Sequence, residues 1–522
     1  MDTAVSTLHL LFRSTGCILG LAILAGVLLL LSPRNTPFVT VNRHAWDVFG
    51  IKAKQDFQSN AESLIRKGLQ KGRSAFQLVT NMGTYLILSD GYAEEIRNDA
   101  RFSAYDALND VILLELPGFE TLGQGSLHNH VSTPAINAMN RELVHLTRPL
   151  LEEAAQCLQA KWTDDSEWHS VSIHDTVLAL VAQMTTRAFV GSELCRNPEW
   201  LDIAISFTIN RAIAVQGIQS WPWPLHVIVH WFLPACRSVR RQIQRAREIL
   251  LPVLERDRQT RDMEQSTNRV FSTLRFIDQY AKGRRYDATM AQLRLTAVSV
   301  LTTSDMVQKV LARICEYPEL IQPLREEVIS VLQSGGLGHN SLLKLTLMES
   351  VMKESQRLEP ATLSASSPAS HVMDFLLTFF IPVSMFRVAK ENVTLQDGIT
   401  IPKGTRLAFA NNLRLDLRMY PDPETFDGYR FQKMRDDPAQ AKLAPFTKTR
   451  TTHLAFGHGK HACPGRFLSC DEAKLILCHI LLKYDFKAEG QVPELTTSGM
   501  FIQRDPGGMM MVRRRKEEVK LE

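Results

Sequence analysis

A single cysteine stands in a glycine-rich stretch near the C-terminal end of this 522-residue chain. Cys463 is preceded by Gly457 and Gly459 and followed by Pro464 and Gly465. Glycine lets a backbone adopt positive φ and approach another group closely. An apolar helical pattern follows, and the N–H groups of a helix start favour a nearby negative charge. We therefore expect a thiolate of low pKa at Cys463, which is well suited to binding iron.

Simpler explanations exist for the individual residues of this stretch. A lone buried cysteine usually acts as a small apolar side chain, and a glycine loop usually only turns the chain. His458, His461 and Cys463 could together bind a metal ion, but no fourth ligand stands nearby in the sequence.

The complete pattern is much more specific than any one of its residues. It resembles the haem-binding signature of the cytochrome P450 family, and it fixes six residue types within ten positions. The resemblance implies haem b, with Cys463 as the axial ligand of the iron and the other matching residues around the cofactor. The matching residues are Phe456, Gly457, Gly459, His461, Cys463 and Gly465.

A second motif lies on an expected helix that ends at Leu358. Glu354 and Arg357 are three positions apart, which usually indicates a surface ion pair of small energetic value. By resemblance to the family, the pair is instead buried on the proximal side of the haem. An arginine before the cysteine loop is then its third partner, and Arg430 matches that arginine.

Hydroxyl side chains in the middle of another expected helix resemble the family's oxygen-binding segment. Such hydroxyls usually bond back to the preceding turn of the helix. By resemblance, Thr302 is the catalytic threonine over the distal face of the haem, and Ser299 takes the place of a small residue. Leu301 stands where the family carries an acid, so water or Thr303 could take over proton delivery.

Cationic partners are needed for the propionate groups of a haem. By resemblance, His461 and Arg387 supply them. Family members usually add a tryptophan from another helix, and His128 or His130 could stand in for it here.

The resemblance also implies partners for the reaction. Oxygen from O2 would be inserted into a lipophilic substrate, with electrons from NADPH delivered by NADPH-cytochrome P450 reductase. Lys460, Arg466 and Lys474 are candidate docking points for an acidic protein, or ordinary solvated surface. The chain resembles fungal members that oxidise terpenoids and other secondary metabolites. Two alternatives stay open: a haem-thiolate isomerase or dehydratase that needs no reductase, and a non-catalytic membrane protein of degenerate fold.

Helical patterns dominate the segments that must position these residues. Apolar residues recur at three- and four-residue spacing in the long stretches, and a few short stretches are typical of strands. We predict a mainly α fold with a minor β-sheet (α+β), the cytochrome P450 fold by resemblance. The expected helices are Arg141–Lys161, Ser238–Arg258, Met290–Glu316, Leu320–Leu332, Leu342–Leu358 and Gly465–Leu482, and the expected strands are Tyr85–Leu88, Met385–Ala389, Val393–Leu395 and Gly404–Ala408.

An uncharged apolar run covers residues 14–31 near the N-terminus. With its flanks it approaches the roughly 20 apolar residues that span a bilayer, and its length argues against the rival interpretation, a cleaved signal peptide. Lys and Arg are in excess after the run, which puts the main body on the cytosolic side. We predict a transmembrane anchor at residues 1–33 and a catalytic domain at 34–522, held by lipid in the endoplasmic reticulum membrane.

Composition excludes several other classes of protein. Hydrophobic residues make up 45% of the chain, which argues against disorder. The net charge is only +5 and no nucleic-acid-binding motif accompanies the basic clusters, so we expect no nucleic acid partner. The eight cysteines contain no C-x-x-C pair, which argues against a zinc ribbon or a disulfide scaffold.

The interval between Arg357 and Arg387 is much longer than in the family. Without residues 364–382 the chain would resemble an uninterrupted family sequence, so we interpret these residues as an insertion. Residues 375–381 form a dense apolar run, which is an aggregation hazard when exposed. A retained intron is one interpretation, and a lid that dips into the membrane is the other.

Overall fold

The computed structural model describes most of the chain, and the predicted anchor 1–33 and insertion 364–382 lie outside the described residues. The side chains of residues 127–131, which include His128 and His130, also lie outside the description. The described residues are 37–47, 50–70, 73–80, 82–113, 116–117, 119, 127–221, 223–261, 272–360, 383–490, 495–498, 501–504 and 508–521.

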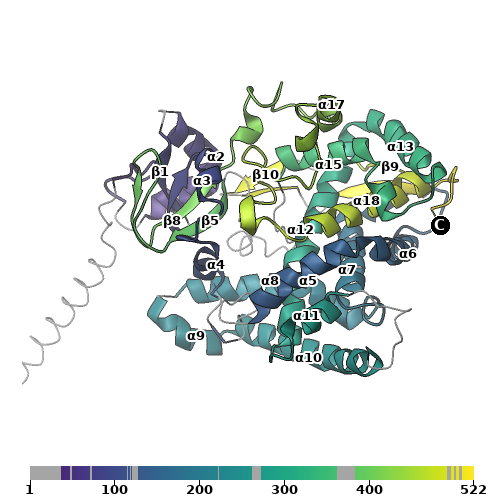
Figure 1. Cartoon of the computed structure of the whole chain (residues 1–522), viewed down its shortest axis with the longest axis horizontal. Coiled ribbons are helices and arrows are strands. Elements are labelled where there is room, and N and C mark those ends of the chain that lie inside the picture. Colours follow the sequence, from purple (N-terminus) through teal and green to yellow (C-terminus); the bar gives the residue numbers. More distant parts are fainter. Residues whose placement is uncertain are drawn as a thin grey trace, which may run out of the picture.

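A five-stranded sheet lies toward one end of the long axis, and helices make up most of the rest (Figure 1). The strand order is β1-β2-β8-β5-β3, with β2 and β8 parallel and the other neighbours antiparallel. A second sheet has the order β4-β12-β9. The strands are β1 Ala75–Thr80, β2 Gly83–Leu88, β3 Phe102–Ser103, β4 His169–Ser172, β5 Val383–Ala389, β6 Val393–Thr394, β7 Thr400–Ile401, β8 Arg406–Ala410, β9 Tyr484–Ala488, β10 Leu495–Ser498, β11 Phe501–Arg504 and β12 Met509–Arg514.

The central helix is α12, which contacts α7, α8, α15 and α18. Most of its side chains are buried, and many of the apolar ones belong to the largest apolar core. The helices are α2 Ile51–Leu69, α3 Tyr92–Ile96, α4 Ala104–Ile112, α5 Leu127–Arg141, α6 Leu143–Trp162, α7 Ile173–Phe189, α8 Pro198–Gln219, α9 His226–Phe232, α10 Pro234–Arg261, α11 Thr273–Ala281, α12 Ala288–Glu316, α13 Ile321–Gln333, α14 His339–Leu342, α15 Thr346–Leu358, α17 Arg430–Asp436 and α18 Arg466–Lys483.

The predicted mainly helical fold with a small sheet is confirmed, and every helix expected from periodicity is present with shifted ends. The starts of α10 and α15 differ most, by four residues each, and α15 was expected from Leu342 but begins at Thr346. The Glu327 carboxylate of α13 accepts hydrogen bonds from the N–H groups of Leu347 and Met348 at 2.6 and 2.9 Å. A side chain from another helix therefore caps α15, and local sequence does not reveal such a cap.

Among the described residues, α8 is long and apolar enough to cross a bilayer. It packs on α10 and α12, however, as a core helix of a globular domain does.

Candidate functional site

The cysteine loop closes through its own backbone. Gly457 and Gly459 both have positive φ, at 66° and 76°, as the sequence predicted. The N–H of Cys463 donates to the carbonyl of Phe456 at 2.8 Å. A Cβ atom at Gly459 would lie 2.7 Å from Cβ of Arg97, so the close approach to a neighbouring segment also requires glycine.

Three contacts fasten the loop to distant segments. The His458 ring lies 2.9 Å from the Glu94 carboxylate of α3, and Asn98 accepts from the N–H of Lys460 at 2.8 Å. Asn140 of α5 donates to the carbonyl of Pro464 at 2.8 Å. The loop is therefore held from both sides, and His458 serves this anchoring.

The thiol of Cys463 is accessible to solvent, although burial in the surrounding protein raises its pKa. Hydrogen bonds from the N–H groups of Gly465 and Arg466 oppose this shift, as does the charge of Arg466. The expected low pKa is wrong for the polypeptide alone, because desolvation outweighs these contributions. A coordinated metal cation would reverse the balance, since it deprotonates a thiol outright. An exposed cysteine that protein atoms nevertheless desolvate indicates a recess at its thiol.

One face of α12 is accessible in the same region. Val298 is 47% exposed although it lies in the middle of the central helix, and Thr302 follows one turn later. Thr303 Oγ1 lies 3.0 Å from Oγ of Ser469, which is in the first turn of α18. Because α18 starts just after Cys463, this contact brings α12 close to the cysteine loop. We call the space bordered by Cys463 and the accessible face of α12 the recess.

The two neighbouring threonines of α12 point in different directions. The Thr302 hydroxyl donates to the carbonyl of Val298 at 2.7 Å, on the accessible face. Thr303 is buried and its hydroxyl contacts Ser469. This placement ties α12 to α18 and does not favour Thr303 as the substitute proton carrier.

Leu301, at the position of the family's acid, is buried in a small apolar cluster with Leu178, Ala182 and Val300. A carboxylate there would lose its hydration without gaining a partner in this cluster, and burying even an uncharged polar group without a hydrogen bond costs roughly 2–7 kcal/mol. The apolar residue and its apolar surroundings therefore match each other.

Two basic side chains with few protein partners, Arg387 and His461, lie in or near the loop. Arg387 is buried, and its Nη2 atom has no hydrogen-bond partner in the described part of the chain. Burial lowers the pKa of Arg387 to about 10. Burial also lowers the pKa of His461 to about 4, and the nearby charge of Arg387 lowers it further. Arg387, a cation without a carboxylate partner among the described residues, and a neutral His461 that can donate an N–H fit the carboxylates of a haem's propionates.

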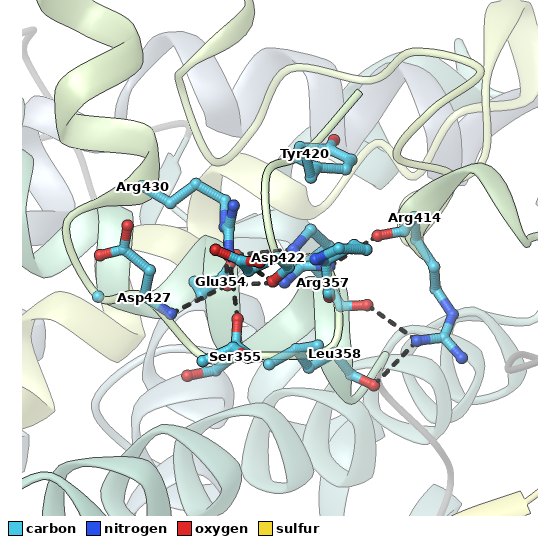
Figure 2. Close-up of polar contacts among 12 residues, drawn as sticks. Glu354, Ser355, Arg357, Leu358, Arg414, Tyr420, Asp422, Asp427 and Arg430 are labelled. Atoms are coloured by element: carbon cyan, nitrogen blue, oxygen red, sulfur yellow. Dashed lines mark hydrogen bonds and ion pairs between the residues drawn. The ribbon is translucent and has the colours of Figure 1, made fainter. Parts of the chain in front are cut away.

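The buried ion pair is placed as predicted. Arg357 donates to both carboxylate oxygens of Glu354 at 2.7 Å, and Arg430 donates to one of them at 2.9 Å (Figure 2). Sequence reasoning missed two further members. Arg414 donates to the carbonyl of Leu358 at 3.2 Å, and the Arg357 guanidinium lies 5.0 Å from the ring centre of Tyr420.

The turn Pro421-Asp-Pro423 supplies further acceptors to the two predicted arginines of this network. The Pro421 carbonyl accepts from Arg430 at 2.5 Å. The Pro423 carbonyl accepts from Arg357 at 2.6 Å. The remaining guanidinium donors are thereby satisfied, so the buried charges have the partners that they need.

A cytochrome P450 family model matches residues 126–367 and 377–512. The chain belongs to the cytochrome P450 family. Cytochrome P450 monooxygenase roqO of Penicillium rubens is 73% identical over 512 residues, with 98% of each chain covered. Fumitremorgin C monooxygenase of Aspergillus fumigatus is 63% identical over 497 residues, with 95% of each covered. The crystal structure of cytochrome P450DA heme domain matches with a TM-score of 0.65 at 17% identity, over 92% of this chain and 98% of that one.

These comparisons confirm the predicted cytochrome P450 monooxygenase, and they relate it to fungal enzymes of secondary metabolism. They favour this activity over the isomerase and over the non-catalytic membrane protein. As a member of the family, this cytochrome P450 uses a haem. The accessible thiol and the unpaired Arg387 are both suited to that cofactor.

One predicted docking residue is not available at the surface of the cytochrome P450. Lys474 is 1% exposed, and its ammonium donates to the carbonyl of Leu342 at 2.8 Å and to Glu349 at 3.2 Å. The pattern of charges along the sequence could not distinguish this buried lysine from the exposed Lys460.

Proposed function

We propose that haem b lies in the recess with Cys463 as its axial ligand, and that the enzyme inserts one oxygen atom from O2 into a lipophilic substrate. A thiolate-ligated haem supplies the chemistry that cleaves the O–O bond. The observation that carries the proposal is the accessible Cys463 thiol next to the accessible face of α12. His461 and Arg387 hold the propionates, while Phe456 and Gly457, Gly459 and Gly465 shape the loop.

Thr302 is the catalytic hydroxyl in this proposal. Its proton is donated to the Val298 carbonyl at 2.7 Å, which leaves its oxygen free to accept a hydrogen bond from water. Because Leu301 brings no acid, a water held by Thr302 carries the proton toward the recess. Thr302 therefore holds and orients this water, and does not titrate itself.

The substrate belongs to the class of fumitremorgin C, an indole alkaloid, and not to the terpenoids that the sequence alone favoured. This choice rests on relatives that are 63% identical and carry the name fumitremorgin C monooxygenase. It also accords with the recess, where aliphatic Val298 and a polar Thr302 lie side by side on α12.

Electrons come from NADPH through a reductase that docks near the cysteine loop. Lys460 is exposed, and Arg466 is half-buried with its guanidinium on the carbonyls of Cys463 and Thr447 at 2.6 and 2.9 Å. Lys460 is thus the better docking residue for an acidic surface, and Arg466 mainly supports the loop.

Membrane lipid holds the enzyme through the anchor at residues 1–33 and through α9. This helix exposes an apolar patch, and the Arg240 guanidinium lies 4.4 Å from the ring centre of Trp231 beside it. Aromatic and cationic side chains together are typical of a membrane interface. The exposed apolar residues are Trp221, Leu225, Val227, Ile228, Trp231 and Phe232.

Reconstitution with reductase tests the activity directly. The purified holoenzyme in phospholipid vesicles receives fumitremorgin C, NADPH and O2, and mass spectrometry follows the product. We expect a product heavier by one oxygen atom, labelled when ¹⁸O2 is supplied, and formed only with reductase. Oxygen-free or reductase-independent turnover would instead support the isomerase alternative.

A further inference from the structure

Arg294 lies on the accessible face of α12. Arg294, Val298 and Thr302 are spaced by four residues, so they follow one another along the same side of the helix. Their neighbours Leu293, Leu295 and others of the helix are buried, whereas Val298 is 47% exposed. The three side chains therefore border the recess, with Arg294 about 12 Å along the helix from Thr302 at 1.5 Å per residue.

The Arg294 guanidinium has no partner within the protein as far as the chain is described. Its Nη1 atom is buried without a hydrogen bond, and no acidic side chain of the described residues forms an ion pair with it. Burial lowers its pKa to about 10, which leaves it charged at neutral pH. By contrast, the buried Arg357 and Arg430 are each satisfied by a carboxylate and by carbonyls.

An unpaired cation inside a protein is costly unless something else supplies an acceptor. Arg387 has the same deficit, and the haem propionates account for it under the proposed function. Arg294 lies on the side of the recess that α12 provides, two turns away from Thr302, so a different acceptor is needed there. A molecule that enters the recess can supply it.

We propose that Arg294 binds an acceptor oxygen of the substrate, a carbonyl or a carboxylate, and thereby fixes its orientation over the haem. This inference rests on the proposed haem site. The planar guanidinium presents paired N–H donors that match one oxygen or two. A substrate that carries a carbonyl or a carboxylate supplies such an acceptor, and a plain hydrocarbon does not.

Imidazole probes test the distance and the chemistry together. One series consists of ω-(imidazol-1-yl)alkanoic acids of graded chain length, and the matched series consists of n-alkylimidazoles. In each the imidazole nitrogen ligates the haem iron and shifts its absorption band, so dissociation constants are read without turnover. At one chain length the acid should bind about ten- to a hundredfold more tightly than the alkyl probe, the range for a hydrogen bond to a charged group.

Three variants of the full chain complete the test. Arg294→Met should bring the acid-to-alkyl ratio close to one, and Arg294→Lys should keep part of it. Arg284→Met, a matched change at an exposed arginine outside α12, should leave the ratio as in the wild type. An unchanged ratio in Arg294→Met, or no preference for the acid at any length in the wild type, overturns the role of Arg294. Absence of any imidazole band in the wild type would instead contradict the haem site itself.

Discussion

Glu354 and Arg357 face each other through two hydrogen bonds of 2.7 Å, and neither side chain is exposed to solvent. Arg430 adds a third bond from a segment far along the chain, at 2.9 Å (Figure 2). Because the pair joins α15 to the segment before the cysteine loop, its integrity and the position of the loop are coupled.

Replacing Glu354→Gln should destabilise the protein by about 3–5 kcal/mol, because it leaves Arg357 and Arg430 buried without a counter-charge. Denaturant unfolding of the haem-free and haem-loaded protein measures this loss. As a control, Arg148→Gln removes an exposed pair with Glu152 and should cost about 0–1 kcal/mol. Equal effects of the two changes would argue against a special role for the buried pair.

Cys463→Ser should remove the strongly red-shifted band of the reduced, carbon monoxide-bound enzyme, because this band requires a thiolate ligand and a serine oxygen donates less electron density to the iron. The wild type should show this band. Cys470→Ala, at a buried cysteine of α18, should retain it. A Cys463→Ser variant that keeps the band would mean that another residue binds the iron.

Thr302→Ala should lower the ratio of product to NADPH consumed, while substrate binding changes much less. The hydroxyl orients a proton-carrying water and adds little to ground-state affinity. Thr303→Ala serves as the matched variant. It breaks the contact with Ser469 and should cost about 0.5–1.5 kcal/mol of stability with the product ratio intact. The roles of the two threonines are reversed if only Thr303→Ala uncouples the reaction.

Glu472 gives the stability a defined pH dependence. Burial raises the pKa of its carboxyl from 4.5 to about 8, opposed by a hydrogen bond from Thr185. The folded state therefore holds a proton that the unfolded state releases, so the stabilising contribution is complete below pH 4.5 and is lost as pH rises through about 8. Glu472→Gln should remove this loss. The melting temperature of the wild type, measured relative to that of the variant, should therefore decrease as the pH rises from 5 to 8. A constant difference would contradict the raised pKa.

Deletion of residues 364–382 should leave haem incorporation intact and improve solubility. The family model is interrupted at residues 368–376, within this stretch. The described chain before it is held at Pro360, whose carbonyl accepts from Lys309 at 3.0 Å, and β5 begins directly after it at Val383. The haem absorbance of the purified protein measures haem incorporation, and the share of the expressed protein that stays in the soluble fraction measures solubility.

The origin of this segment can be read from the messenger RNA. A transcript without the segment supports the retained intron. An active protein translated from a transcript that keeps it would refute the intron and favour the membrane-dipping lid.

The sequence by itself determined the turn of the cysteine loop and placed Glu354 and Arg357 on one side of a helix, because glycine conformation and helix periodicity depend mainly on neighbouring residues. Spacing alone indicated a surface pair, and resemblance to the family supplied the burial of this pair and Arg430 as its partner. The mainly helical fold also followed from helix periodicity, with ends misplaced where a distant side chain such as Glu327 caps a helix.

Only the tertiary structure decided which side chains are buried and what they meet there. It showed that Lys474, a predicted docking residue, is a buried partner of Glu349. It also showed that the hydroxyls of Thr302 and Thr303 have different partners. It also left Arg294 without a counter-charge beside the recess. Desolvation and charge pairing depend on atoms that distant segments bring together, so no local pattern in the sequence contains them.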